Sequence, residues 1–224
     1  MRSADDDALA GRIPERKQPF YVSRAKRLFD LMLASVLLLF TLPLLVLLVV
    51  LNLLFAGWPP FYTGRRIGQN GKPFRIIKLR TMVKSAESFV ESPGWIKNGI
   101  SDEYLRNFKL SADPRVTKLG TFLRQTSLDE LPQLFNVLKG DMSMVGPRPL
   151  QALELALHYG QASSQLLSVK PGLTGRWQAT GRSGITYPER CSVELAYVEQ
   201  VSFGSDVRIL CRTIPSVLLR RGTA

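Results

Sequence analysis

The chain has 224 residues, a length that fits one domain with an appendage but not two full domains. Hydrophobic residues make up 45% of it and charged residues 21%, which allows a core and excludes global disorder. Lysine and arginine outnumber aspartate and glutamate by 30 to 18, so the net charge is +12 and a polyanionic partner is expected. Two cysteines, Cys191 and Cys211, and a single histidine exclude a disulfide scaffold, argue against a zinc site and fit a reducing, cytosol-facing location.

The N-terminal part contains a membrane segment. Residues 1–22 are polar and predict a flexible tail, and residues 31–51 carry no charge. A helix of that length crosses a hydrocarbon core of about 30 Å. Pro43 lies in the middle of this run, where proline breaks or kinks a helix. Two interpretations of residues 23–56 stay open: a helix–break–helix hairpin that enters and leaves by one face, and a kinked helix that spans the bilayer.

Positive charge flanks the apolar run on both sides, so the positive-inside bias identifies no outer end. The flanking basic residues are Arg24, Lys26, Arg27, Arg65, Arg66, Lys72 and Arg75. A hairpin that returns to the same face satisfies both flanks.

Residues 57–224 have the composition of a soluble domain, and their pattern predicts a mainly helical α+β fold. Asn70-Gly71 separates two apolar-rich arms within residues 61–82, which predicts a β-hairpin. Apolar spacing predicts one helix over 121–138, ended by Gly140, and another over 150–168, whereas 170–188 is predicted to be a loop. From Asp206 a basic amphipathic helix, broken or bent at Pro215, is expected to lie on an anionic membrane surface or to pack on the core.

Two adjacent carboxylates, Asp129 and Glu130, are predicted to begin the helix over 121–138. Ser127 and Glu130 have the spacing of a capping box. Acidic residues at a helix N-terminus are usually structural, because they favour the helix dipole. The neighbouring basic residues favour chemistry instead: Arg115, Lys118, Arg124 and the Arg148 of Gly-Pro-Arg-Pro. Arginines beside a helix N-terminus bind phosphate, and two carboxylates there suit a metal ligand and a nucleophile, so the pattern indicates phosphoryl transfer.

The sequence offers few residues for other kinds of catalysis or binding. His158 has no catalytic partner in its sequence neighbourhood and is expected at the surface or an interface. No glycine-rich nucleotide motif is present, and the basic residues form no stripe with interleaved aromatics, so nucleic-acid binding is not expected.

The central string TSLDELPQLFNVLKGDMSMVGPRP (126–149) resembles the signature of the bacterial sugar transferases, the monotopic phosphoglycosyl transferases. The resemblance extends on both sides of this string and covers roughly residues 24–215. It includes the apolar segment, the hairpin, the strings DPRVTKLGTFLRQTSLDE and KPGLTGRWQATGR, and the C-terminal part. Among members, the chain is most similar to the short exopolysaccharide-initiating type, the undecaprenyl-phosphate hexose-1-phosphate transferases.

The resemblance implies a role for individual residues. Asp129 would be the nucleophile that takes the sugar phosphate from a UDP-sugar and expels UMP, and Glu130 would hold Mg²⁺. Arg124 and Arg148 would face phosphate, and Arg182 would lie near the nucleotide. The two basic residues of KLRTM, Lys78 and Arg80, match positions near the site that bind substrate phosphate. The membrane segment would be re-entrant with its kink at Pro43.

The same resemblance implies a bacterial inner-membrane protein with a cytosolic catalytic domain. Its partners would be a UDP-sugar, polyprenyl phosphate and membrane lipids, and homodimerisation stays open. Glu194 and Pro188 depart from the family pattern in a part that shapes sugar or nucleotide recognition, so the identity of the sugar stays open. A non-catalytic membrane adaptor and a membrane-associated nucleic-acid binder are the competing hypotheses, and the intact dyad with Arg124 and Arg148 argues against the adaptor.

Overall fold

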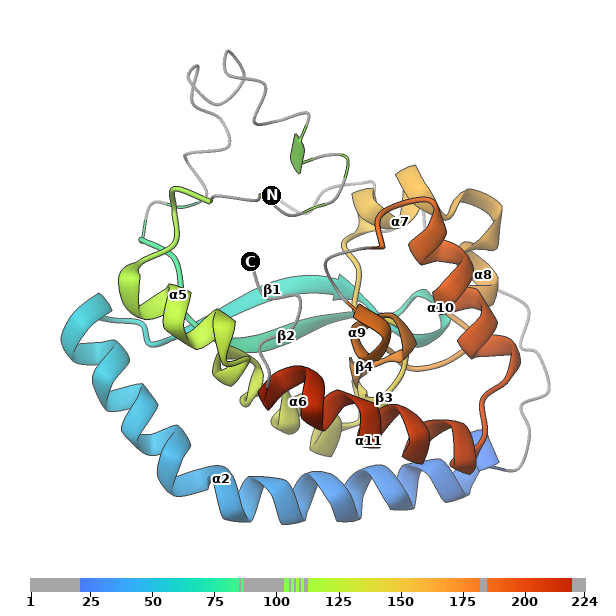
Figure 1. The fold of residues 1–224 in the computed structure, drawn as a ribbon, viewed down its shortest axis with the longest axis horizontal. Coiled ribbons are helices and arrows are strands. Elements are labelled where there is room, and N and C mark those ends of the chain that lie inside the picture. Colours follow the sequence, from blue (N-terminus) through green and yellow to red (C-terminus); the bar gives the residue numbers. More distant parts are fainter. Residues whose placement is uncertain are drawn as a thin grey trace.

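The computed structural model describes residues 21–84, 86, 103, 104, 106, 108, 110, 113–181 and 185–218. Residues 1–20 of the predicted tail, nearly all of residues 85–112, and Arg182 lie outside this described part. The last two residues of the predicted tail, 21 and 22, belong to η1. In chain order its first half contains the π-helical turn η1 (Tyr21–Ala25), α2 (Lys26–Ala56), β1 (Phe61–Ile67), the 3₁₀ turn η2 (Gln69–Gly71), β2 (Pro73–Leu79), α5 (Lys118–Gln125), the 3₁₀ turn η3 (Leu128–Glu130) and α6 (Gln133–Lys139). The second half contains β3 (Ser143–Val145), α7 (Ala152–His158), η4 (Gly160–Ala162), α8 (Ser163–Leu166), β4 (Gly172–Thr174), α9 (Arg176–Gly181), α10 (Glu189–Glu199) and α11 (Phe203–Leu218). The described part is therefore mainly helical α+β, as predicted (Figure 1).

The β-hairpin lies at the centre of the molecule, surrounded by helices (Figure 1). β1 and β2 pair antiparallel, with Gly64 opposite Ile76. In the connecting turn Asn70 has φ 56° and Gly71 has φ 77°, a left-handed backbone that asparagine and glycine adopt more readily than other residues. The predicted hairpin and its turn are confirmed.

Two predictions for the C-terminal half are wrong. Residues 170–188 are not all loop: they contain α9 and also β4, which pairs parallel with β3. Strands of three residues are too short to show an alternating pattern in the sequence. The helix predicted over 150–168 is divided into α7, η4 and α8, because Gly160 takes a left-handed backbone with φ 48°.

The apolar segment forms one continuous helix, α2, of 31 residues. The expected break at Pro43 does not occur; Figure 1 shows instead that α2 bends part-way along its length. A proline inside a helix removes one backbone hydrogen bond, which permits a bend without ending the helix. A straight helix of this length would measure about 46 Å, more than a bilayer core of about 30 Å.

The N-terminal end of α2 is held by polar side chains that enter the folded domain. Lys26 pairs with Asp206 at the start of α11, and both side chains are buried. The carboxylate of Asp30 accepts hydrogen bonds of 3.0 Å from the Ser143 hydroxyl and from the Met144 backbone N–H, both on β3. Buried charged groups are stable only when they are paired or hydrogen-bonded in this way. These contacts therefore hold the N-terminal end of α2 against α11 and β3.

The C-terminal end of α2 is held by the same domain. Asn52 Nδ2 donates to the carbonyl of Arg80 at 2.8 Å. In return, Arg80 Nη2 donates to the backbone carbonyls of Ala56 and Gly57, where the helix ends. A cation at this position satisfies carbonyls that have no partner within the helix and complements the helix dipole.

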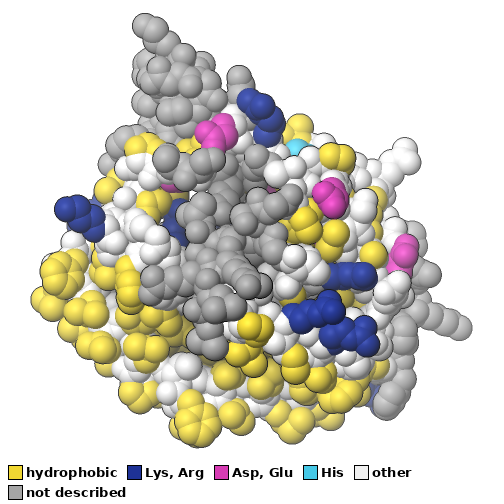
Figure 2. Space-filling model, viewed as in Figure 1, with side chains coloured by type: hydrophobic (Ala, Val, Ile, Leu, Met, Phe, Trp, Pro, Cys, Tyr) yellow, Lys and Arg dark blue, Asp and Glu magenta, His cyan; other side chains and the backbone are white. Residues whose placement is uncertain are grey.

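Between its two fixed ends α2 presents apolar side chains to solvent. Only 17% of its most apolar stretch is buried, and by length and composition it is the one helix of the described residues that is able to cross a membrane. The large exposed side chains are Leu28, Met32, Val36, Leu37, Leu39, Phe40, Leu42, Leu44, Val46, Leu47, Val50, Leu53, Leu54 and Phe55. They belong to the hydrophobic lower edge of the molecule in Figure 2, where Figure 1 places α2. An apolar surface of this extent indicates a membrane or protein contact.

The C-terminal amphipathic helix α11 begins at Phe203 and continues through Pro215, so the break expected at Pro215 does not occur. Both predicted contacts are compatible with it. Its buried side carries Ile209, a member of the main hydrophobic core, and Asp206. Its exposed side carries Phe203, Val207 and Ile214. Phe203 packs edge-to-face on Phe29 of α2 with 5.3 Å between the ring centroids, so both helices lie on the same side of the molecule.

Candidate active site

The two carboxylates lie in a tight turn between helices. The helix predicted over 121–138 is divided into α5, η3 and α6, and Asp129 and Glu130 are in η3. The predicted capping box is wrong: Ser127 takes a left-handed backbone with φ 56° and its side chain makes no capping hydrogen bond. Pro132 precedes the first residue of α6, where a helix tolerates proline. Gly140 ends α6 with φ 96°, as predicted.

Asp129 and Glu130 differ in environment although they are adjacent. Asp129 is buried, with 7% of its surface exposed, whereas the Glu130 side chain is 30% exposed. Burial raises the pKa of Asp129 to about 6; the charge of Glu130 also raises it, while Lys78 and Arg124 lower it. Nζ of Lys78 lies 2.8 Å from Oε1 of Glu130, which joins β2 to the dyad. The structure thus brings three predicted site residues together.

Arg124 reaches the dyad from the last turn of α5. Its Nε donates to the hydroxyl of Thr81 at 3.0 Å, and its charge acts on Asp129. α5 lies very close to the segment after β2, because a Cβ on Gly120 would lie 2.0 Å from the carbonyl oxygen of Thr81. Only glycine permits that approach, which sets the position of Arg124.

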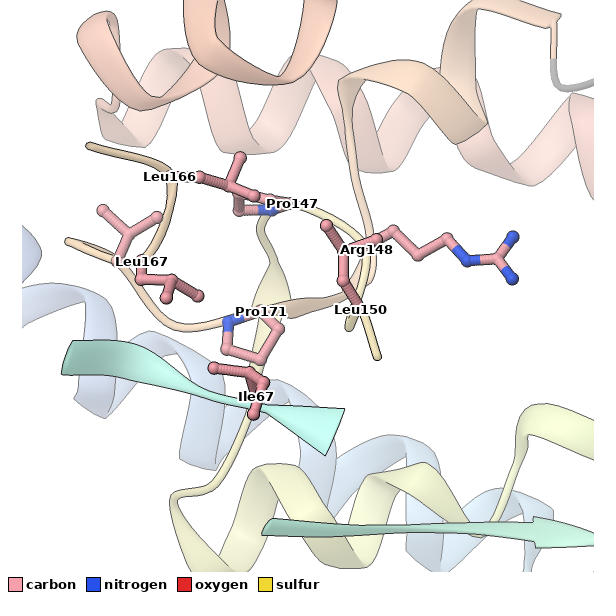
Figure 3. A pocket seen from close by; sticks show the side chains of 8 residues that line it. Ile67, Pro147, Arg148, Leu150, Leu166, Leu167 and Pro171 are labelled. Carbon is pink, nitrogen blue, oxygen red and sulfur yellow. The ribbon is translucent and has the colours of Figure 1, made fainter. Parts of the chain in front are cut away.

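Arg148 lies in the turn after β3. At Gly146 a Cβ would lie 2.4 Å from the carbonyl oxygen of Lys170, so the turn is pressed against β4. A small apolar cavity lies beside it, lined by Ile67, Leu150 and Leu166 among others (Figure 3). The guanidinium of Arg148 points away from this cavity in Figure 3. Its Cζ lies 5.8 Å from the centroid of the Trp177 ring. The pKa of Arg124 is lowered mainly by burial, and the charges of Arg115 and Arg148 lower it further.

The site therefore combines a buried carboxyl, a second and more exposed carboxyl, and three basic groups, Lys78, Arg124 and Arg148, from separate elements. Such a constellation is suited to stabilising a phosphate group in front of a nucleophile or base. A family model for the bacterial sugar transferases matches residues 21–220, which include every one of these groups. The chain belongs to the bacterial sugar transferase family.

Individual relatives extend over most of this sugar transferase. The exopolysaccharide production protein ExoY of Rhizobium meliloti (strain 1021) is 44% identical over 199 residues, covering 89% of this chain and 88% of the relative. The undecaprenyl-phosphate galactose phosphotransferase of Salmonella typhimurium is 40% identical over 197 residues, covering 88% of this chain and 41% of the relative. The UDP-galactose-lipid carrier transferase of Erwinia amylovora has the same identity and coverage. The sugar transferase thus matches less than half of the length of these last two proteins.

Other predicted site residues of the sugar transferase lie elsewhere. Arg80 is buried, with 8% of its surface exposed, and its guanidinium contacts the end of α2, so the structure gives it a role in holding this helix. Phosphate binding by Arg80 stays a prediction that would require these contacts to change. Pro43 lies within α2, and Arg182 lies outside the described residues. Within the described part no group of three histidine, cysteine, aspartate or glutamate side chains is arranged for a metal ion.

Glu194, a departure from the family pattern, is buried rather than available to a sugar. Its carboxylate accepts hydrogen bonds from the hydroxyl of Tyr159 and, at 3.3 Å, from the backbone N–H of Arg148. Arg190 lies beside it and pairs with Glu154 at 3.4 Å, and all three charged side chains are at most 3% exposed. These contacts connect α10 to the turn that contains Arg148. Sequence spacing alone does not predict this connection. Pro188, the second departure, is exposed and precedes α10.

The raised pKa of Asp129 predicts opposite effects of pH on stability and on activity of the sugar transferase. The folded protein binds this proton with a pKa of about 6, against 3.8 without the fold, so the free energy of unfolding falls as pH rises from about 4 to 6. Asp129→Asn removes the buried charge and should stabilise the protein by about 1–3 kcal/mol at pH 7.5, with less effect near pH 4. Activity that needs the carboxylate should instead rise as pH increases through about 6.

Thermal unfolding of wild type and Asp129→Asn in the same detergent between pH 4.5 and 8 measures the first effect. An Asp129→Asn protein that is less stable than wild type at pH 7.5 would mean that Asp129 is held charged by its basic neighbours, contrary to this expectation.

Proposed function

We propose that this sugar transferase moves a hexose 1-phosphate from a UDP-sugar to polyprenyl phosphate, releases UMP, and so initiates exopolysaccharide or glycan assembly. The relatives named for exopolysaccharide production and for transfer to undecaprenyl phosphate or a lipid carrier support this reaction class. The single observation that carries the proposal is the buried Asp129 beside Glu130, facing Lys78 and Arg124.

The proposed reaction has two displacements at one phosphorus atom. A carboxylate oxygen of Asp129 attacks the phosphorus that bears the sugar, the bond from that phosphorus to the bridging oxygen breaks, and UMP leaves with the electron pair. An oxygen of polyprenyl phosphate then attacks the same phosphorus, the bond to Asp129 breaks, and the carboxylate is regenerated. Burial suits Asp129 to this role, because a poorly solvated carboxylate is a better nucleophile than a hydrated one. Arg124 and Arg148 would hold the charge of the phosphate oxygens.

The carboxylates fit Mg²⁺, which proteins commonly bind through one or two carboxylates together with substrate phosphates and water. Glu130 would hold the ion, because its side chain is the partly exposed member of the pair, and Lys78 would then share or release its contact with Oε1. Bound Mg²⁺ would supply neutralisation of phosphate charge.

We further propose that α2 is re-entrant and that the catalytic domain faces the cytosol at the bacterial inner membrane. Support comes from the two ends of α2, since Asp30 contacts β3 and Asn52 contacts the residue after β2, all within one folded domain. A spanning helix would carry its ends to opposite sides of the bilayer, and one of these two sets of contacts would break. The apolar exposed side of α11 would rest at the same membrane surface.

Cysteine labelling tests this topology. In a background in which Cys191 and Cys211 are replaced by serine, Arg24→Cys and Thr63→Cys place exposed thiols before and after α2. We expect a membrane-impermeant maleimide to label both in inside-out vesicles and neither in intact spheroplasts. Labelling from opposite sides would establish a spanning helix. Pro43→Leu, which favours a straight helix, should lower activity by moving the site away from the lipid headgroups.

The activity itself is tested with the full chain in nanodiscs. Mg²⁺, undecaprenyl phosphate and a panel of UDP-sugars are supplied, and UMP release and lipid-linked sugar phosphate are measured. We expect one or a few UDP-sugars to support turnover, and Asp129→Asn to support none. No turnover with the whole panel, together with salt-sensitive nucleic-acid binding, would contradict the proposal.

A further inference from the structure

Three arginines make no ion pair with a carboxylate within the described part of the chain: Arg66, Arg124 and Arg148. By contrast, Arg115 pairs with Asp113 and Arg190 with Glu154. The Arg66 side chain donates only to the neighbouring carbonyl of Arg65, at 2.6 Å. Burial lowers the pKa of Arg66 and of Arg124, because it disfavours the charged guanidinium, and an anion bound beside them would offset this cost. From the sequence, Arg124 and Arg148 are expected to bind phosphate, whereas Arg66 is expected to be one of the basic residues that flank the apolar segment.

The hairpin register places Arg66 on the face that carries the dyad contact. In an antiparallel pair, residues directly opposite share a face, and alternate residues of one strand share it too. Tyr62 lies opposite Lys78, and Arg66 opposite Phe74. Arg66 and Lys78, the partner of Glu130, therefore lie on the same face, about 13 Å apart along the strand at roughly 3.3 Å per residue.

Gly64 and Tyr62 lie on β1 between these two basic residues. A Cβ at Gly64 would lie 2.6 Å from the hydroxyl of Tyr62, so the Tyr62 ring lies across the glycine. On β2 the same face carries Ile76 and Phe74, which are buried in the main core, whereas Tyr62 is 40% exposed. Arg66 and Lys78 therefore lie at opposite ends of this face, on either side of core residues.

The charge of Arg148 acts on both Arg66 and Arg124. The backbone N–H of Ile67 donates to the carbonyl of Leu150 at 3.0 Å, which attaches the end of β1 to the segment that carries Arg148. Burial is the main cause that lowers the pKa of Arg66 and of Arg124, and the charge of Arg148 lowers both further. Glu154 raises the pKa of Arg66 from a distance, but its ion pair is with Arg190.

We propose that Arg66 is a third phosphate-binding arginine of the active site, at the end of a row formed with Arg148 and Arg124 that leads to Asp129. The proposal rests on the proposed function for the identity of the phosphate. That phosphate belongs either to the nucleotide part of the UDP-sugar or to polyprenyl phosphate, since both carry the oxygens that a planar guanidinium binds in pairs.

Arg66→Gln and Arg66→Lys test the proposal, with Arg75→Gln as the matched control. Arg75 lies on the neighbouring strand, is exposed, and faces the opposite side because its register partner is Arg65. Three measurements are made on the full chain in nanodiscs: binding of UDP by calorimetry, formation of the covalent adduct from UDP-sugar without lipid, and discharge of that adduct by undecaprenyl phosphate. Unfolding temperatures confirm that each variant is folded, and Arg66→Lys serves if Arg66→Gln does not fold.

We expect Arg66→Gln to weaken one of these steps by about 10- to 100-fold, the size of a lost charged hydrogen bond, and Arg75→Gln to change none. Weaker UDP binding and slower adduct formation with normal discharge assign Arg66 to the nucleotide phosphate. Normal adduct formation with slow discharge assigns it to the lipid phosphate. Wild-type values in all three measurements would overturn the proposal. If wild type itself forms no adduct and transfers no sugar, the proposed function fails, and UDP binding alone then decides the role of Arg66.

Discussion

Replacing Asp129 by asparagine is expected to reduce turnover by at least about 1,000-fold and to abolish the covalent intermediate, because an amide is not a nucleophile towards phosphorus. Wild type incubated with its UDP-sugar in the absence of lipid should release UMP once per active site. Intact-protein mass spectrometry should then find the mass of one sugar phosphate on wild type and none on Asp129→Asn. The folded state should survive the change, since a buried charge is removed.

Glu130→Gln is the companion variant. It keeps the shape of the side chain but weakens both Mg²⁺ binding and the contact with Lys78, so the adduct should form more slowly and at the same residue. A mechanism in which the lipid phosphate attacks the UDP-sugar directly predicts a different result. UMP would then appear only after lipid is added, and no adduct would be found under conditions of full turnover. That result would remove the covalent step and leave the transferase assignment in place.

The second large effect is expected at the arginines of the phosphate site. Arg124→Lys and Arg148→Lys keep the positive charge but lose the planar guanidinium, which binds two phosphate oxygens at once. Each substitution should lower turnover by about 10- to 100-fold, the cost of one or two charge-assisted hydrogen bonds. Arg124→Lys should have the additional effect of losing the contact from Nε to Thr81. UMP release under single-turnover conditions measures both variants.

Arg208→Lys is a suitable control for these two substitutions, because Arg208 is an exposed residue of α11 outside the site. Near-normal activity of both Arg124→Lys and Arg148→Lys, with unchanged unfolding temperatures, would mean that neither arginine contacts phosphate. The row that leads through Arg148 to Asp129 would then be misplaced.

Local patterns predicted much of the chemistry because the residues involved are close in sequence. Asp129 and Glu130 are adjacent, Arg124 precedes them by one helical turn and a loop, and Asn70-Gly71 specifies its own turn. The capping box failed for a related reason. Ser127 satisfies the spacing rule, but its left-handed backbone, next to the tightly packed α5, directs the chain into a 3₁₀ turn. Packing thus outweighed a local preference worth about 1 kcal/mol.

The roles of long-range contacts could not be predicted. Arg80 is two residues from Lys78, but β2 ends at Leu79, so the strand period does not determine where the Arg80 side chain points. Lys78 contacts Glu130 of the dyad, whereas Arg80 contacts the end of α2. Glu194 reaches the backbone of Arg148 across 46 positions of sequence. No period or motif encodes such a pairing, because it depends on how separate elements pack.

The sequence by itself determined an apolar segment long enough to cross a membrane, the hairpin, the dyad with Arg124 and Arg148 on either side of it in the chain, and the resemblance to the sugar transferases, since each depends on composition, periodicity or contiguous residues. Only the tertiary structure decided that both ends of α2 are held by one domain, that Lys78 pairs with Glu130, and that Arg66 lies on the same face of the hairpin as Lys78. These features arise from strand register and from buried polar pairs. Both bring together side chains that the chain separates by tens of residues, and their partners are set by the packing of the whole core.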